Sequence, residues 1–163
     1  MKRIILILIF VTLPIKFFCQ TKIQTFNYLN EKLEMYKLET LETNYIYMFQ
    51  EVEIKSEKVI NFLEFCTTFE LCSTAYFISP TNYYGIATKN KTNAIWIELY
   101  FKPNSITTQQ IDLDTKYRFK GDNVSRVTII LGKNTPKNEI DKIKKAFLHL
   151  LKLYGVEKKD LFD

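Results

Sequence analysis

A change in hydrophobic period constrains the fold more than any other feature of the sequence. Between residues 44 and 131 apolar and polar residues alternate, whereas apolar residues on both sides recur at intervals of three and four. Alternation indicates half-buried strands, and the longer spacing indicates amphipathic helices. The chain is therefore expected to place a β-rich centre between two helices. Seven strands are predicted, at 45–54, 59–65, 73–79, 83–88, 94–101, 110–120 and 126–131.

The two flanking helices have recognisable end signals. The first is predicted to begin after Thr25, which is a suitable N-cap residue. The second is predicted over 136–154, with Thr135 as N-cap, Pro136 at the first helical position and Gly155 as the stop. The expected apolar faces are Phe26, Leu29, Leu33 and Tyr36 in the first helix, and Ile140, Ile143, Phe147, Leu150, Leu151 and Tyr154 in the second.

The connections between the predicted strands are short and contain no helix, which favours an antiparallel sheet. The chain of 163 residues suits one domain, and its 4 Gly and 4 Pro are too few for a linker or a fibrous protein. The predicted fold class is α+β: an N-terminal helix, an antiparallel sheet or open barrel of six to seven strands, and a C-terminal helix packed on it. One globular domain is expected over residues 20–163.

Residues 1–19 have the pattern of a secretory signal peptide. Lys2 and Arg3 precede ten residues, 4–13, whose one polar side chain is a threonine, and Pro14 follows. This apolar run is shorter than the roughly 20 residues that a membrane-spanning helix needs. The protein is therefore expected to be exported to the periplasm or secreted, with no transmembrane span in the mature chain. The alternative is lipidation of Cys19, which would give a lipid-anchored envelope protein.

Loss of this segment changes the charge balance. Three of the 23 basic residues and none of the 18 acidic residues lie within 1–19, so the net charge falls from +5 to +2. A charge this small is weak support for binding a polyanion. No nucleic acid partner is expected.

Two of the three cysteines, Cys66 and Cys72, lie in the predicted mature chain. An even pair in an oxidising compartment predicts a disulfide. On a helix, six positions rise about 9 Å, which exceeds the roughly 7 Å that a disulfide spans between Cα atoms. A disulfide between these residues therefore requires a turn between strands over residues 66–72. The alternative is a pair of buried thiols.

Four aromatic residues, Tyr83, Tyr84, Trp96 and Tyr100, lie close together in the sequence. Exposed aromatic side chains stack on sugars or anchor a protein partner. These four residues are therefore a candidate contact surface for a protein or glycan partner. The alternative is that they pack in the core or pair across strands.

The sequence contains no phosphate-binding loop, nucleophile elbow or metal-ligand spacing. No catalytic, cofactor-binding or metal-binding residue is therefore assigned, and no cofactor is expected. The predicted function is an exported, non-catalytic binding or interaction module. The alternatives are a small exported hydrolase that uses scattered acidic residues such as Asp112 and Asp114, or the lipid-anchored envelope protein.

The layout resembles a group of small uncharacterised exported bacterial proteins. The shared features are a signal ending near Cys19, a helix over 28–33, an aromatic-rich β region and a terminal helix over 143–150. The order of helix, strands and helix is also similar to the pleckstrin-homology-like barrel, whose last helix plugs an open end. These resemblances imply architecture and export, and they imply no activity.

Overall fold

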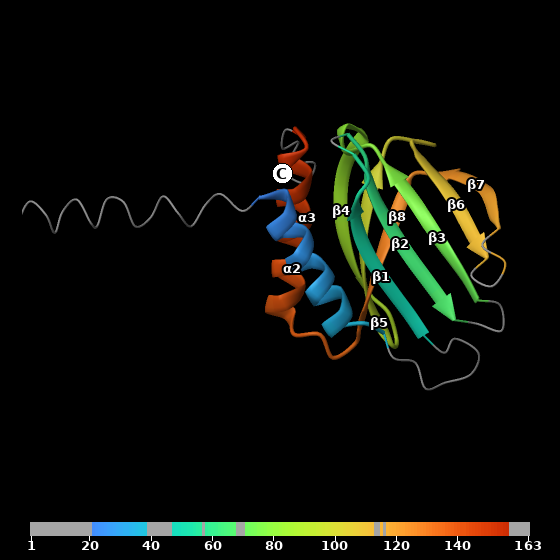
Figure 1. The fold of residues 1–163 in the computed structure, drawn as a ribbon. Coiled ribbons are helices and arrows are strands. Elements are labelled where there is room, and N and C mark those ends of the chain that lie inside the picture. The colour runs from blue at the N-terminus through green and yellow to red at the C-terminus, as the bar shows by residue number, and fades with distance from the viewer. Residues whose placement is uncertain are drawn as a thin grey trace, which may run out of the picture.

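Two helices lie together on one side of eight strands in the computed structural model (Figure 1). The structure describes residues 21–38, 47–56, 58–67, 71–112, 115 and 117–156. The predicted signal peptide and Cys19 lie outside these ranges. The helices are α2 (Lys22–Met35) and α3 (Lys137–Leu153). Within the described ranges, no helix combines the length and the apolar character needed to cross a bilayer.

The strands form two antiparallel sheets. The five-stranded sheet has the order β1-β2-β3-β6-β7, and the three-stranded sheet has the order β4-β5-β8. The predicted α+β class with antiparallel pairing is confirmed, and the sheets do not close into a barrel. The strands are β1 (Tyr47–Ile54), β2 (Ile60–Thr67), β3 (Leu71–Ile78), β4 (Tyr83–Asn90), β5 (Ala94–Phe101), β6 (Ile106–Asp112), β7 (Arg118–Val124) and β8 (Arg126–Gly132), with a 3₁₀ turn at Pro80–Asn82.

The prediction of one strand over 110–120 is wrong, because the chain reverses inside it. Asp112 Oδ1 accepts a hydrogen bond from the Thr115 N–H at 3.0 Å, and the Asp112 N–H donates to the Tyr117 carbonyl at 3.0 Å. A side chain that bonds the backbone ahead of it is a standard way to start a turn. The reversal separates β6 from β7 and leaves Tyr117 and Phe119 exposed.

The first helix begins one turn earlier than predicted. Thr21 is its N-cap: the Thr21 hydroxyl accepts from the Gln24 N–H at 3.2 Å, and the Thr21 N–H donates to Gln24 Oε1 at 3.0 Å. This reciprocal pair is a capping box. Thr25 is therefore an interior residue, and its buried hydroxyl donates to the Thr21 carbonyl at 3.1 Å.

The last helix is shifted by one residue at its start, where Pro136 rather than Thr135 is the N-cap. Its predicted stop is confirmed. Gly155 has φ +83°, and its N–H donates to the Lys152 carbonyl at 2.9 Å while the Val156 N–H reaches the Leu151 carbonyl at 3.2 Å. Glycine suits this left-handed position because it has no Cβ to clash with the backbone.

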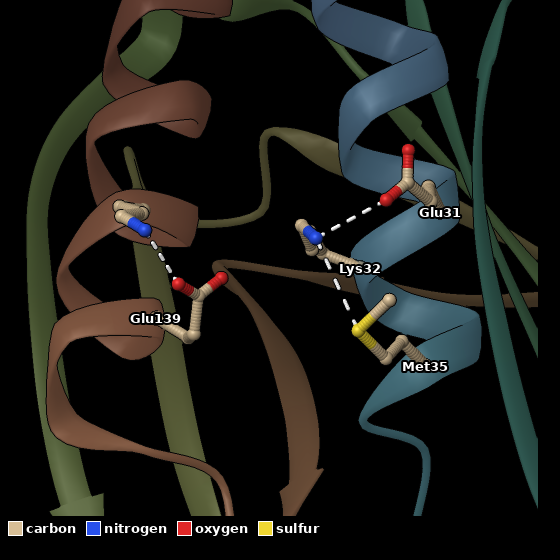
Figure 2. A network of polar contacts seen from close by, with 5 residues as sticks. Glu31, Lys32, Met35 and Glu139 are labelled. Carbon is tan, nitrogen blue, oxygen red and sulfur yellow. Dashed lines mark hydrogen bonds and ion pairs between the residues drawn. The ribbon is translucent and has the colours of Figure 1, made fainter.

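Ion pairs near the contact between α2 and α3 stay within their own helices (Figure 2). Lys32 Nζ lies 3.1 Å from Glu31 Oε1 and 3.9 Å from Met35 Sδ, all on α2. On α3, Glu139 Oε1 lies 2.6 Å from Lys142 Nζ. The Glu139–Lys142 pair has the i,i+3 spacing that stabilises a helix locally. We infer that the apolar faces provide most of the helix–helix contact.

Alternate residues of β5 point to two different environments. One set belongs to a core cluster that also contains the apolar residues of both helices and of β8. Its β5 members are at most 5% exposed: Ile95, Ile97, Leu99 and Phe101. Successive residues of a strand point to opposite faces, so Trp96, Glu98 and Tyr100 lie on the other side of the sheet.

Two side-chain amides replace strand pairing along the free edge of β1. The buried Gln50 donates to the Thr128 carbonyl at 3.0 Å and accepts from the Ile130 N–H at 2.8 Å, which joins β1 to the outer edge of β8. Asn30 of α2 bonds the N–H and the carbonyl of Val52 at 2.9 and 3.0 Å. The two sheets are thus held together at this edge without a continuous ladder.

Candidate binding groove

The strand register of the three-stranded sheet builds one polar and aromatic face. Trp96, Glu98 and Tyr100 are alternate residues of β5, so they point the same way. Their Cα partners on β8, in the same order, are Ile130, Thr128 and Arg126. Their Cα partners on β4 are Lys89, Ala87 and Gly85. Aromatic groups therefore lie at both ends of this face, with a carboxylate between them.

A groove of about 700 Å³ lies over this face. Its floor contains Trp96 and Tyr100 of β5 together with the β8 residues on the same face. Tyr76 of β3 and residues 123 and 124 of β7 also line it, so both sheets contribute to the groove. Asn104, which has φ 55° in the turn that follows β5, is a further lining residue. The volume is in the range of small-molecule and saccharide sites.

Glu98 lies beneath the groove and is fully buried. Its Oε2 is 2.7 Å from Lys89 Nζ and also accepts a hydrogen bond from the Tyr100 hydroxyl. Its Oε1 is 3.2 Å from Arg126 Nη1. A buried carboxylate needs such partners, because removing it from water is costly. Glu98 therefore ties a groove aromatic and two cations to the centre of β5.

The surroundings of Glu98 keep it ionised. Burial alone would raise the pKa of this carboxyl, but the hydrogen bonds from Lys89 and Tyr100 and the positive charges of Arg126 and Lys89 together hold the pKa below its usual range. A general acid needs the opposite shift, toward the operating pH. Glu98 is thus built to hold its neighbours in place rather than to donate a proton.

Replacement of Glu98 by glutamine is expected to lower the free energy of unfolding by about 1.5–3 kcal/mol at neutral pH, since hydrogen bonds to a charged group are worth that much. Because the Glu98 carboxyl has a lower pKa in the folded protein than in the unfolded chain, its ionisation stabilises the fold above the unfolded pKa of about 4.3. This stabilisation is lost as the pH falls through the folded-state pKa. The difference between Glu98→Gln and the wild type should therefore shrink in acid. Urea unfolding of both proteins at several pH values measures this difference in the free energy of unfolding. A difference that does not change with pH would contradict this account.

Cations border the groove. The side chains of Lys89 and Arg126 are 47% and 49% exposed while they contact Glu98, so both reach solvent. Lys91 Nζ lies 4.6 Å from the centre of the Trp96 ring, and Lys133 Nζ donates to the Lys91 carbonyl at 2.9 Å. Among the described residues that line the groove, Arg126 alone has a charged side chain. The side of the groove along β4 and β8 is therefore positive.

The structure separates the four aromatic residues of the predicted contact surface. Trp96 and Tyr100 line the groove. Tyr84 is 45% exposed at a shift in the β4–β5 register, and its ring centre is 6.1 Å from that of Tyr100. Tyr83 points to the core, where it packs on Phe101 with ring centres 5.8 Å apart, and burial raises the pKa of Tyr83 to about 12.

Sequence reasoning missed the groove residues that other strands contribute. Tyr76 comes from β3, where its ring lies 6.0 Å from that of Phe62. Arg126 and Thr128 come from β8, and Asn123 comes from β7, at a position between the strands predicted over 110–120 and 126–131. Their approach to β5 depends on which strands pair, and local patterns carry no information on that.

The cysteines and acidic residues singled out in the sequence lie elsewhere. Cys66 and Cys72 are direct Cα partners across the β2–β3 hairpin, which is the arrangement that a disulfide requires. The disulfide itself stays a prediction, because their side chains are outside the described part of the chain. Asp112 starts the turn after β6 and does not line the groove, and Asp114 lies outside the described residues.

The groove offers the chemistry of noncovalent recognition: aromatic faces, amide and hydroxyl groups and a guanidinium. Within the described ranges, no group of three His, Cys, Asp or Glu residues is placed to hold a metal ion. A scan against protein-family models, a search of curated proteins and a search of solved structures each found no match to this chain.

Proposed function

We propose that the protein is an exported, non-catalytic binding module whose ligand occupies the groove. One observation carries this proposal: the β5 register places Trp96 and Tyr100 on the same face, on the floor of a groove of about 700 Å³ that both sheets line. Aromatic side chains at the centre of such a surface provide large contact area at low entropic cost. A binding site is the role that this arrangement fits best.

The state of the carboxylates favours binding over hydrolysis. Glu98, the acidic group beneath the groove, has both oxygens in contact with Lys89, Tyr100 or Arg126. Hydrolysis of a glycosidic bond by the usual route needs two carboxyl groups flanking the bond, one of them with a raised pKa. Asp112, offered by the hydrolase alternative, does not line the groove.

Two features support export. Residues 1–19 have the pattern of a signal peptide, and the β2–β3 register sets Cys66 opposite Cys72, where a disulfide would form in an oxidising compartment. The intact mass of the protein from its host, with and without reductant before alkylation, tests both. We expect a chain that begins at Gln20, with two thiols that alkylate after reduction alone. A lipid on Cys19 would instead indicate the envelope-anchored alternative, and an unprocessed chain with free thiols would contradict export.

Trp96 is the one tryptophan of the chain, so its fluorescence reports on the groove directly. We expect a ligand from a panel of neutral and acidic oligosaccharides and peptides to change this fluorescence saturably. Replacement of Tyr100 by alanine should weaken binding by about tenfold or more, as expected for a central aromatic contact.

Tyr117→Ala is the matched control, because Tyr117 is exposed beside β7 and does not line the groove. This variant should bind as the wild type does. Binding that is lost in Tyr117→Ala and retained in Tyr100→Ala would place the site elsewhere. A panel without any saturable response would count against the binding role.

A further inference from the structure

The spacing of the groove aromatics fits an extended ligand with repeating rings. Trp96 and Tyr100 are four residues apart on β5, which separates their Cα atoms by about 13 Å. Tyr76 adds a third aromatic ring from the other sheet, and Asn104 and Asn123 add amide groups. Flat aromatic faces match the apolar C–H faces of sugar rings, and amides match their hydroxyl groups. The groove thus has the two kinds of group that an oligosaccharide needs.

The charges at the groove favour an acidic ligand. Arg126 has five N–H donors, and its contact with Glu98 is through Nη1. Since its side chain is 49% exposed, further donors are available to a carboxylate or sulfate in the groove. Lys89 and Lys91 add two more positive charges beside Trp96. With Glu98 as the one buried negative charge, these four groups together are cationic.

The free edge of β8 argues against an extended peptide as the ligand. A peptide commonly binds by adding a strand to an exposed sheet edge. At the edge of β8 that borders the groove, the Thr128 carbonyl and the Ile130 N–H are already bonded to Gln50. Two of the main-chain groups on β8 that would hold a peptide are thus occupied, whereas the Arg126 side chain that would hold an acidic saccharide is half exposed.

We propose that the groove binds an anionic oligosaccharide, with sugar rings stacked on Trp96 and Tyr100 and an acidic group bound by the Arg126 guanidinium. This inference rests on the proposed binding function and names its ligand class. Glu98 is a positioning residue in this arrangement, because it orients Arg126 without contacting the ligand. Uronic acids and sulfated sugars share the two features that this site would bind, which are sugar rings and an acidic group.

The test compares tetragalacturonate with its methyl ester, which has the same sugar chain without the charges. Binding is followed by Trp96 fluorescence and by calorimetry. We expect the acid to bind at least about tenfold more tightly than the ester, with a preference that falls as salt screens the charges. Sulfated cellotetraose is the second acidic probe, and tighter binding of it than of cellotetraose identifies sulfate as the acidic group and supports the proposal equally.

Arg126→Gln should abolish the preference for the acid. Arg118→Gln, at an exposed position on β7 that does not line the groove, should leave it unchanged. If Arg126→Gln unfolds because Glu98 loses a partner, Arg126→Lys retains the positive charge without the planar fork, and it should reduce the preference.

Binding in which neither acidic probe is preferred, tetragalacturonate over its ester or sulfated cellotetraose over cellotetraose, would overturn this inference and leave the proposed binding function intact. Binding of tetraglutamate with no response to any saccharide would also overturn it, in favour of a peptide ligand. Absence of binding by every probe, saccharide and peptide, would count against both the ligand class and the binding function.

Discussion

Replacement of Phe147 by alanine is expected to lower the free energy of unfolding by about 3–5 kcal/mol. Phe147 is 4% exposed on α3 and belongs to the core cluster that both helices share with β5 and β8. The ion pairs of Figure 2 run within single helices, so they do not hold α3 in place. Removal of the ring therefore leaves a cavity in the contact that attaches the last helix to the sheet.

Urea unfolding followed by circular dichroism measures this effect. Lys145→Ala is the matched control on the same helix, because Lys145 is exposed, and its effect should stay within about 0.5 kcal/mol. The same midpoint for Phe147→Ala and the wild type would show that α3 does not pack on the core as described.

Prediction from the sequence was most accurate where the hydrophobic period and the residues that typically end a helix or strand agree. The strand predicted over 94–101 coincides with β5, because polar turn residues flank an apolar run on both sides. The stop at Gly155 was found for a similar reason, since its left-handed φ suits glycine. The reversal after Asp112 was missed because polar and apolar residues keep alternating through it, so the pattern there is the same for one strand as for two.

The division into two sheets could not be predicted from local patterns. Four of the pairings join sequence-adjacent strands by short connections, but β3 pairs with β6 and β5 pairs with β8 across longer stretches of chain. Such pairings depend on which faces bury the most apolar surface in the whole molecule. The groove depends on the β5–β8 pairing, which sets Arg126 opposite Tyr100, and on the approach of the other sheet, which contributes Tyr76.

Only part of the candidate site could therefore be predicted from the sequence. The four-residue interval between Trp96 and Tyr100 places both on one face of any strand, which is a local property. Nothing local indicates that Glu98, between them, is buried, since a charged residue in a strand is ordinarily exposed. Its burial follows from Lys89 and Arg126 on the two neighbouring strands.

Replacement of Gln50 by leucine tests how the two sheets are joined. Gln50 is 3% exposed, and its amide bonds the Thr128 carbonyl and the Ile130 N–H on the outer edge of β8. The leucine side chain has a similar size but neither donates nor accepts a hydrogen bond, so the Thr128 carbonyl and the Ile130 N–H would lose their partners. Each unsatisfied buried group costs about 1–3 kcal/mol, and we expect a total loss of about 2–6 kcal/mol in the free energy of unfolding.

Hydrogen exchange separates this cause from a general loss of stability. The Ile130 amide should exchange faster in Gln50→Leu under native conditions, whereas the Leu131 amide, which alternation points toward β5, should retain its protection up to the global limit. Gln110→Leu, at an exposed position of β6, is the control and should change stability by less than about 0.5 kcal/mol. Unchanged exchange at Ile130 would mean that another group bonds this edge of β8, and that the sheets are joined in some other way.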